Sequence, residues 1–263
     1  MMRAIAINVG ANTNEPGFRA PVYPDGRFEF LPIPETEPVD GAPTYGNLAP
    51  DLGVTIPGEL RDTPVHLDPE FPEYPRGQRY TYGDKHGVKA GPLAELSAGD
   101  YVFFYATLSV TPRLEPDPPA SDRAGGPDRG WLPPEWGAFL IGRFKLSRDP
   151  VTGEGYRSLP APEREPFATN AHVKRDPVDA RVFLLGDPAD SLLYERCVPL
   201  SRPTGGTEAN AVVTELSADS GRGPWWRRPL RFDRRSTRLL LAVEESVRRG
   251  LARRAGPDSE YQS

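Results

Sequence analysis

The 263-residue chain has little of what several common protein classes require. Its single cysteine, Cys197, excludes an internal disulfide framework and a thiolate zinc cluster. No apolar run approaches the roughly 18–20 residues that a membrane-spanning helix needs. The N-terminal apolar stretch is too short for a signal peptide and predicts a first strand instead. We therefore expect an intracellular, cytoplasmic protein without a membrane span.

The usual nucleotide and hydrolase motifs are also missing. The sequence has no phosphate-binding loop ending in Gly-Lys-Ser/Thr, no Gly-x-Gly-x-x-Gly, no Gly-x-Ser-x-Gly and no His-Glu-x-x-His. Ordinary ATPases, Rossmann dehydrogenases, serine hydrolases and zincins are therefore not the first choices. The residues point to no particular cofactor.

Proline, in contrast, is abundant, with 32 residues beside 26 glycines. Because proline removes a backbone donor and clashes inside a helix, such a chain cannot be mostly helical. Apolar or alternating runs predict strands at 4–9, 27–31, 101–108, 136–144, 181–185 and 211–213, with one helical turn at 92–96. The Pro-, Gly- and Asp-rich segment 112–134 is expected to be an excursion between two strands.

These elements predict an α+β fold in a single domain over residues 1–263. Its core would be a mixed or antiparallel sheet, partly closed into a barrel at most, with few helices and long Pro-rich loops. Gly137 and Gly142, inside one predicted strand, indicate bulges or a close approach of two backbones.

Charge is distributed unevenly, although the net charge is only −5. Residues 221–254 contain eleven arginines and three acidic residues, so an acidic body carries a basic C-terminal segment. Such asymmetry favours a polyanionic partner. The candidate contacts to a nucleic-acid backbone are Trp225, Trp226, Arg227, Arg228 and Arg231.

The same segment, 222–254, has a purely structural interpretation. Asp233 or Ser236 would cap an amphipathic helix that runs to about Arg254. Its broad apolar stripe would include Leu239, Leu240, Val243, Val247 and Leu251. The arginines would then form its solvated face, and Glu244 would pair with the arginine four residues later.

Three histidines are present, and two of them are candidates for chemistry. His66 and Asp68 are two residues apart, so they share a face if extended, and could form a general acid/base pair or half of a metal site. The alternative is a turn in which Asp68 caps the local backbone. His172 is either a third member of this centre or a structural histidine, whereas His86 is expected to be exposed. No metal is assigned, although His66, Asp68 and His172 together could bind one.

A polar loop at residues 8–19 offers a second set of candidates. Asn8, Asn12 and Asn14 carry amides that read base edges, and Arg19 carries a guanidinium that grips phosphate or guanine. The alternative is a long turn in which asparagine tolerates unusual backbone angles.

Several of these pieces occur together in one known family. They are Asn8-Val9-Gly10, Pro16-Gly17-Phe18-Arg19-Ala20-Pro21, Asp25-Gly26, Leu31-Pro32-Ile33-Pro34-Glu35, His66-Leu67-Asp68-Pro69-Glu70, Tyr82-Gly83-Asp84, Gly99-Asp100-Tyr101-Val102-Phe103-Phe104-Tyr105, and more loosely Gly137-Ala138-Phe139-Leu140-Ile141-Gly142 and Asn170-Ala171-His172-Val173. In this order, over residues 3–200, the chain resembles the nucleotide-modification-associated domain 3 family. It departs from the family at Tyr82-Gly83-Asp84, where members carry Gly-Gln.

The resemblance implies a role in systems that modify or process bases in nucleic acid, and it adds Tyr82 and Asp84 to the nucleotide-binding candidates. Our leading hypothesis is a base-modification protein that acts on or near DNA, with His66, Asp68 and His172 as its catalytic centre. The alternatives are a non-catalytic reader that holds a modified base among Tyr80, Tyr82 and Tyr105, and an interaction protein whose basic helix meets an acidic partner. A nucleic acid or a nucleotide is the expected ligand.

Overall fold

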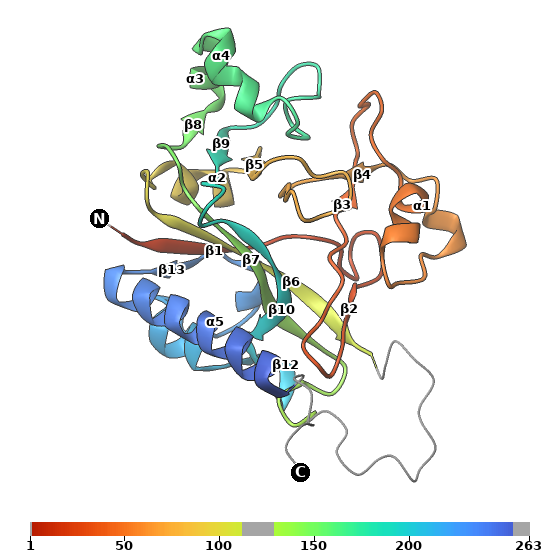
Figure 1. Ribbon diagram of the computed structural model, residues 1–263, viewed down its shortest axis with the longest axis vertical. Coiled ribbons are helices and arrows are strands. Elements are labelled where there is room, and N and C mark those ends of the chain that lie inside the picture. The colour runs from red at the N-terminus through yellow and green to blue at the C-terminus, as the bar shows by residue number, and fades with distance from the viewer. Residues whose placement is uncertain (1, 112–128, 255–263) are drawn as a thin grey trace, which may run out of the picture.

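The apolar runs of the sequence assemble into one six-stranded mixed sheet (Figure 1). The computed structural model describes residues 2–111 and 129–254, with side chains up to residue 247. The sheet has the order β10-β7-β6-β1-β13, and β2 pairs with the far end of β6. Its strands are β1 (Ala4–Asn8), β2 (Pro21–Val22), β6 (Tyr101–Val110), β7 (Trp136–Lys145), β10 (Leu192–Pro199) and β13 (Leu230–Phe232).

Both parallel and antiparallel pairs occur in this sheet, which confirms the expected α+β class. β1 runs parallel to β6 and antiparallel to β13, whereas β6–β7 and β7–β10 are antiparallel. Within the described residues the sheet ends at β10 and β13, so it does not close into a barrel.

Apolar residues cover both faces of the sheet, which explains the continuous apolar run of β6. Val102 and Phe104 point into one core cluster, while Phe103 and Tyr105 point into another. A strand that alternates between two cores needs apolar residues at every position. Helix α5 (Arg234–Arg254) lies along the second face, and the N-terminal loops cover the first (Figure 1).

Strand β7 approaches β10 closely at Gly142. A Cβ there would lie 2.8 Å from the backbone oxygen of Leu192 and 2.9 Å from the ring of Phe71. The pairing with β6 also shifts register next to this residue. The sequence-based expectation of a bulge or close approach at this glycine is therefore confirmed.

Smaller elements surround the main sheet. A three-stranded sheet has the order β5-β9-β8, and two further ribbons pair β3 with β4 and β11 with β12. These strands are β3 (Ile33–Pro34), β4 (Val65–His66), β5 (Thr81–Asp84), β8 (Val151–Thr152), β9 (Val182–Leu185), β11 (Ser201–Arg202) and β12 (Gly205–Ala209). The remaining α-helices are α1 (Tyr45–Leu48), α2 (Gly87–Ala94), α3 (Gly153–Ser158) and α4 (Ala161–Arg164), with short 3-10 helices at Ala49–Asp51, Gly58–Leu60, Glu165–Phe167 and Trp225–Arg227.

Two expected strands are wrong. Residues 27–31 make only an isolated bridge between Phe28 and Val22, because the carbonyls of Phe30 and Leu31 accept hydrogen bonds from separate loops. Residues 211–213 start a π-helical turn, Val212–Leu216, instead of a strand. The Asn210 side chain accepts the Val212 N–H at 3.0 Å and so caps this turn.

The basic segment forms the predicted helix, which the structure places at Arg234–Arg254. α5 begins at Arg234, and the Asp233 carboxylate caps it by accepting the Ser236 N–H at 2.7 Å. Its buried stripe includes Leu240, as predicted, and Glu244, whereas Leu239 is 42% exposed. Glu244 turns inward to pair with Arg143 of β7. The side chains of the arginines expected to pair with Glu244 and Glu245 along the helix lie outside the described residues.

The excursion predicted at 112–134 lies largely outside the described residues. Its described end packs against the domain: Leu132 is buried, and the Trp131 indole donates to the carbonyl of Pro24 at 3.2 Å. In the part of the chain that the structure describes, no helix is both long and apolar enough to cross a bilayer.

Candidate functional site

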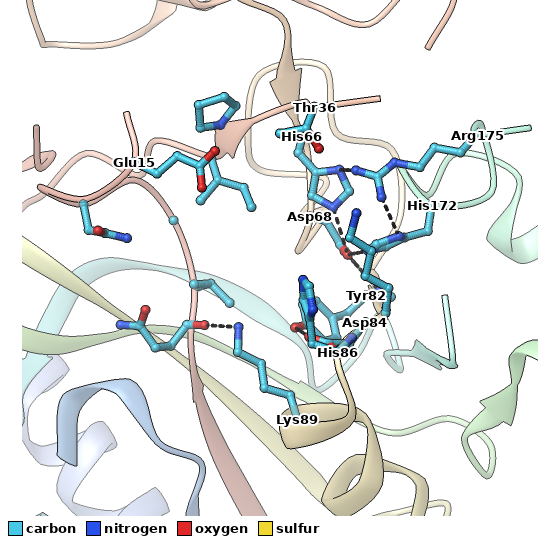
Figure 2. Close-up of a pocket in the computed structure, with 18 residues that line it drawn as sticks. Glu15, Thr36, His66, Asp68, Tyr82, Asp84, His86, Lys89, His172 and Arg175 are labelled. Atoms are coloured by element: carbon cyan, nitrogen blue, oxygen red, sulfur yellow. Dashed lines mark hydrogen bonds and ion pairs between the residues drawn. The ribbon is translucent and has the colours of Figure 1, made fainter. Parts of the chain in front are cut away.

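His66, Asp68 and His172 come together at one side of a polar cavity of about 440 Å³ (Figure 2). His66 ends β4, and Asp68 lies in the turn directly after it. His172 comes from the loop between Phe167 and β9. All three are buried, with exposed fractions of 4–6%. The structure thus unites two sequence motifs that lie far apart in the chain.

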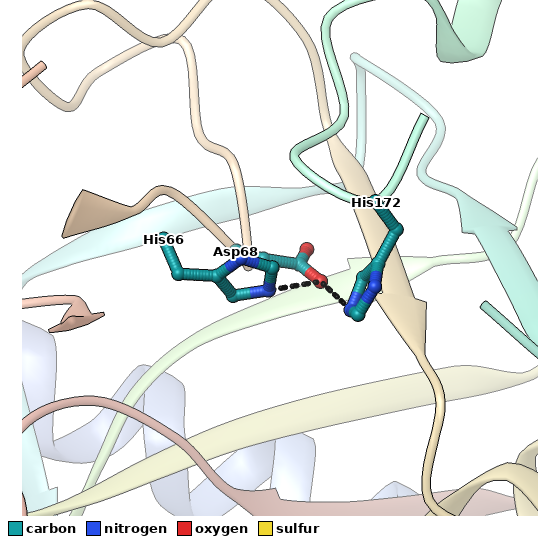
Figure 3. A group of neighbouring side chains, drawn as sticks. All are labelled: His66, Asp68 and His172. Atoms are coloured by element: carbon teal, nitrogen blue, oxygen red, sulfur yellow. Dashed lines mark ion pairs between the residues drawn. The ribbon is translucent and has the colours of Figure 1, made fainter. Parts of the chain in front are cut away.

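The two imidazoles face the same carboxylate oxygen (Figure 3). The Nε2 atom of His66 is 3.8 Å from Oδ2 of Asp68, and Nε2 of His172 is 3.6 Å from the same oxygen. The two rings meet edge to face with centroids 4.6 Å apart. Three potential ligand or proton-transfer atoms therefore converge on one small volume.

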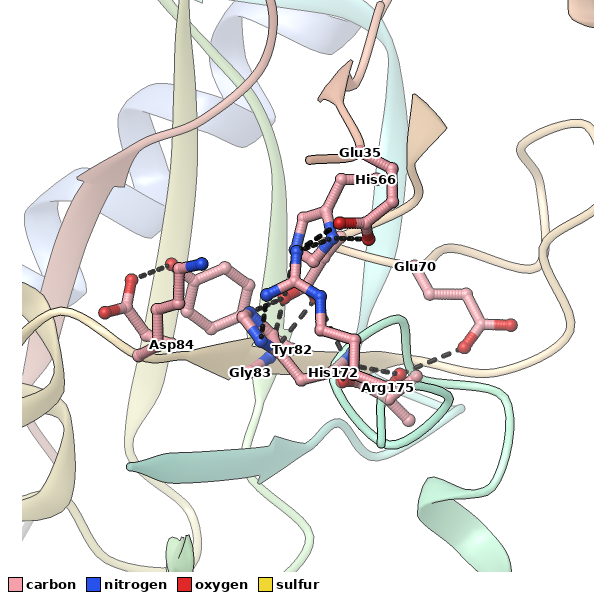
Figure 4. Close-up of polar contacts among 12 residues, drawn as sticks. Glu35, His66, Glu70, Tyr82, Gly83, Asp84, His172 and Arg175 are labelled. Carbon is pink, nitrogen blue, oxygen red and sulfur yellow. Dashed lines mark hydrogen bonds and ion pairs between the residues drawn. The ribbon is translucent and has the colours of Figure 1, made fainter. Parts of the chain in front are cut away.

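Each imidazole contacts its own carboxylate through Nδ1, and Figure 4 shows Glu35 beside His66. Nδ1 of His66 lies 2.7 Å from Oε2 of Glu35, and Nδ1 of His172 lies 2.6 Å from Oδ1 of Asp179. Arg175 joins the two carboxylates by donating to Glu35 at 2.5 Å and to Asp179 at 2.7 Å. The rings are therefore fixed in orientation by a buried network of charges.

Strand β5 sets the distance between Asp68 and His172. The Gly83 N–H donates to Oδ2 of Asp68 at 2.9 Å, and the Asn170 amide donates to Oδ1 at 3.2 Å. A Cβ at Gly83 would lie 2.7 Å from the ring of His172. Glycine at this position therefore lets the imidazole pack directly against the strand that holds the carboxylate.

Burial and neighbouring charges perturb the ionisation of the centre. Burial raises the pKa of Asp68 well above its ordinary value, against the donors Gly83 and Asn170. Burial and His66 lower the pKa of His172 to about 4, so its imidazole is neutral at physiological pH. Burial would raise the pKa of Glu35, but hydrogen bonds from His66 and Arg175 outweigh it and lower the pKa to about 2.

The opposite wall of the cavity carries a lysine and two of the nucleotide-binding candidates. Lys89 of α2 donates to the carbonyl of Asn8 at 2.7 Å, and burial lowers its pKa. The Tyr82 hydroxyl donates to Asp84 at 2.7 Å, and both side chains line the cavity. The wall thus presents acidic, basic and hydroxyl groups to any ligand.

A second cavity, of about 130 Å³, shares Asn8 and Asn12 with the first. The sequence-predicted residues that line it are Asn8, Asn12, Asn14, Arg19, Trp226 and Arg227. The turn interpretation of this loop also holds in part, because the Asn12 side chain accepts the Asn14 N–H at 2.8 Å. The six residues predicted to bind a nucleotide all line one or both cavities. They are Asn8, Asn12, Asn14, Arg19, Tyr82 and Asp84.

Arg19 is held against an aromatic surface beside the second cavity. Its guanidinium lies 4.3 Å from the centre of the Trp136 ring. Trp136 meets Trp226 edge to face at 5.7 Å. The Nε atom of Arg19 is buried and makes no hydrogen bond. Stacking of this kind fixes a guanidinium in place while its outer nitrogens still bind an anion.

The structure divides the predicted backbone contacts into three groups. Trp225 is completely buried and donates to the carbonyl of Thr207 at 2.8 Å, so its assignment as a stacking surface is wrong. Trp226 and Arg227 line the second cavity. Arg228 and Arg231 are exposed and line neither cavity.

The three tyrosines suggested for a base-reading pocket do not form one. Tyr82 lines the main cavity, but the Tyr80 hydroxyl donates to Glu73 at 2.5 Å. Tyr105 points into the second core cluster and donates to the carbonyl of Arg228 at 2.7 Å.

Sequence reasoning missed the residues that support the centre, which are Glu35, Arg175, Asp179 and Lys89. Glu35 lies in a Pro-rich stretch without periodicity, and only the pairing of β3 with β4 brings it to His66. Asp179 and Arg175 were detectable in principle, since both lie within seven residues of His172.

The structure therefore defines the protein as an α+β domain in which a buried His-Asp-His centre faces a polar cavity. The family model of nucleotide modification associated domain 3 matches residues 3–242, so the chain belongs to this family. The match extends beyond residue 200, where the resemblance was expected to fade, and into α5. No curated protein and no solved structure matches the chain.

Proposed function

We propose that the protein modifies or processes a base of nucleic acid, with DNA as the first substrate to test. The base of one nucleotide would occupy the main cavity, and His66, Asp68 and His172 would act on it. The observation that carries this proposal is the convergence of those three buried side chains at a cavity lined by the nucleotide-binding candidates. The volume of about 440 Å³ lies in the usual range of about 300–1,000 Å³ for small-molecule sites.

The second cavity supports the proposal because it offers a place for a phosphate. Arg19, fixed on Trp136, and Arg227 both line it. A planar guanidinium binds a phosphate through two parallel hydrogen bonds. Since the two cavities share Asn8 and Asn12, a base in the first and its phosphate in the second would belong to one ligand.

Nucleoside mass spectrometry of DNA and RNA from cells with and without the gene tests the function. Loss of a modified nucleoside that returns with the wild-type gene, but not with His172→Gln, is the expected result. Lys174→Gln is the matched control, because Lys174 is exposed in the same loop and lines neither cavity. An unchanged nucleoside profile, or full rescue by His172→Gln, would contradict a catalytic role and favour the reader.

Calorimetric titrations then locate the ligand. We expect Arg19→Gln and Arg227→Gln each to weaken binding of a deoxynucleoside monophosphate about 10-fold, with little effect on the free nucleoside. Arg228→Gln and Arg231→Gln should spare the monophosphate and weaken only a longer single strand, with a shallower salt dependence. Equal binding of the monophosphate by all four variants would refute the phosphate assignment.

A further inference from the structure

The tautomers of both histidines follow from their carboxylate partners. An ionised carboxylate only accepts hydrogen bonds, so the short Nδ1 contacts of His66 to Glu35 and of His172 to Asp179 need a proton on each Nδ1. Arg175 lies further from the same nitrogens, at 3.2 and 3.3 Å, because it shares the two carboxylates. An imidazole that carries its single proton on Nδ1 has a lone pair on Nε2.

Those lone pairs point at a third acceptor. Both Nε2 atoms face Oδ2 of Asp68, and the three atoms all lie within 4.8 Å of one another. The only hydrogen-bond donor to Oδ2 within the described residues is the Gly83 N–H. Three acceptors that surround one space repel each other unless a proton or a metal ion lies between them, and separations of 3.6 and 3.8 Å are too long for a shared proton.

The surroundings match those of known metal-binding histidines. A ligating histidine nearly always donates its other ring N–H to a carboxylate or carbonyl, which fixes the tautomer and raises the basicity of the ligand. Here both histidines do so, and Arg175 ties the two supporting carboxylates together. A general acid/base pair would need only one histidine held in this way.

We infer that His66, Asp68 and His172 bind one divalent first-row transition-metal ion through Nε2, Oδ2 and Nε2. Two imidazoles with one carboxylate suit zinc, iron or manganese better than magnesium or calcium, which prefer oxygen ligands. The remaining positions of the ion would face the main cavity, where water or an oxygen of the ligand completes the coordination.

A modest contraction of the site is needed. Ligand atoms about 2.0–2.2 Å from a metal ion lie about 3.0–3.4 Å from one another, against 3.6 and 3.8 Å between the histidines and Asp68. Shifts of a few tenths of an ångström close these two gaps, and the two Nε2 atoms, which lie within 4.8 Å of each other, must also approach. The inference depends on these side chains alone and holds whether or not the nucleotide proposal is correct.

The chain has only three histidines, which allows a direct test by NMR. In long-range ¹H–¹⁵N spectra of the full-length protein, one equivalent of zinc should shift the Nε2 signals of two imidazoles. Their Nδ1 signals should stay protonated, and the third imidazole, His86, should not change. Binding at other nitrogens, or no stoichiometric binding, would overturn the inference.

Variants then connect the signals to residues. His172→Gln and Asp68→Asn should abolish stoichiometric zinc binding in calorimetric titrations, and His86→Gln should keep it. Glu35→Gln, which supports a ligand without touching the ion, should weaken zinc binding by about 10–100-fold. Circular dichroism of each variant separates loss of the site from loss of the fold. Undiminished zinc binding by folded His172→Gln would contradict the assignment.

Discussion

Replacement of Arg175 by methionine would test whether a buried charge network sustains the centre. The side chain is 5% exposed, and it donates to Glu35 at 2.5 Å and to Asp179 at 2.7 Å. Methionine preserves much of the aliphatic length and removes the charge. Two carboxylates then lose their shared cation, although each keeps its hydrogen bond to a histidine.

The expected loss of stability follows from the burial of the two partners. Removal of one member of a buried ion pair costs about 3–5 kcal/mol, because the other charge stays desolvated. Glu35 is 2% exposed and should bear most of this penalty, whereas Asp179 is 26% exposed and regains water. For a chain of this size, the loss corresponds to a fall in Tm of about 6–20 °C.

Thermal and urea unfolding of five proteins would measure the effect. They are the wild type, Arg175→Met, Glu35→Gln and the double variant, with Lys174→Met as the exposed control in the same loop. The double variant should lose less than the sum of the single variants, since neither charge is left without the other. A loss below about 1 kcal/mol for Arg175→Met, or strict additivity, would refute the network.

Three further predictions concern parts of the fold away from the cavities. Cys197 is fully buried and burial raises its pKa, so Ellman's reagent at pH 8 should detect no thiol in the folded protein and one in denaturant. Glu244→Gln should lower the unfolding free energy by about 3–5 kcal/mol in urea titrations, because it leaves Arg143 beneath α5 without its charged partner. The Ser236 N–H lowers the pKa of Asp233, so its capping of α5 is present above the unfolded pKa and lost as the pH falls through the folded pKa. Asp233→Asn, which caps without titrating, should reduce the fall in Tm between pH 5 and pH 3, and an unchanged fall would exclude the cap as its cause.

The long strands were predictable because one physical constraint determines them. Residues 101–108 and 136–144 are buried on both faces, and a strand under that constraint is apolar throughout. The weaker strands were not predictable in the same way. β13 alternates over only three residues, and its pairing with β1 depends on a contact across most of the chain.

The candidate site likewise contains residues that the sequence could predict and residues that it could not. Histidines are rare in this chain, so His66, Asp68 and His172 could be selected from the sequence. Glu35 could not, because β3 and β4 are two residues each and carry no periodic signal. Trp225 and Trp226 look equivalent in sequence, yet a 3-10 turn buries the first and leaves the second at the second cavity. The local sequence pattern therefore predicted the reactive side chains, whereas the residues that hold them in place, such as Glu35, depend on tertiary contacts.

The position of both cavities follows from one interruption at an edge of β6. β1 pairs with β6 as far as Tyr105, and β2 resumes the parallel pairing only at Ser109. Between them the chain leaves the sheet as the loop that carries Asn12 and Arg19, and Thr107 of β6 lines the second cavity. Ligand sites in parallel sheets form where a strand ends and the chain departs from its neighbour. The end of β1 at Asn8 is such a point, which explains why Asn8 contributes to both cavities.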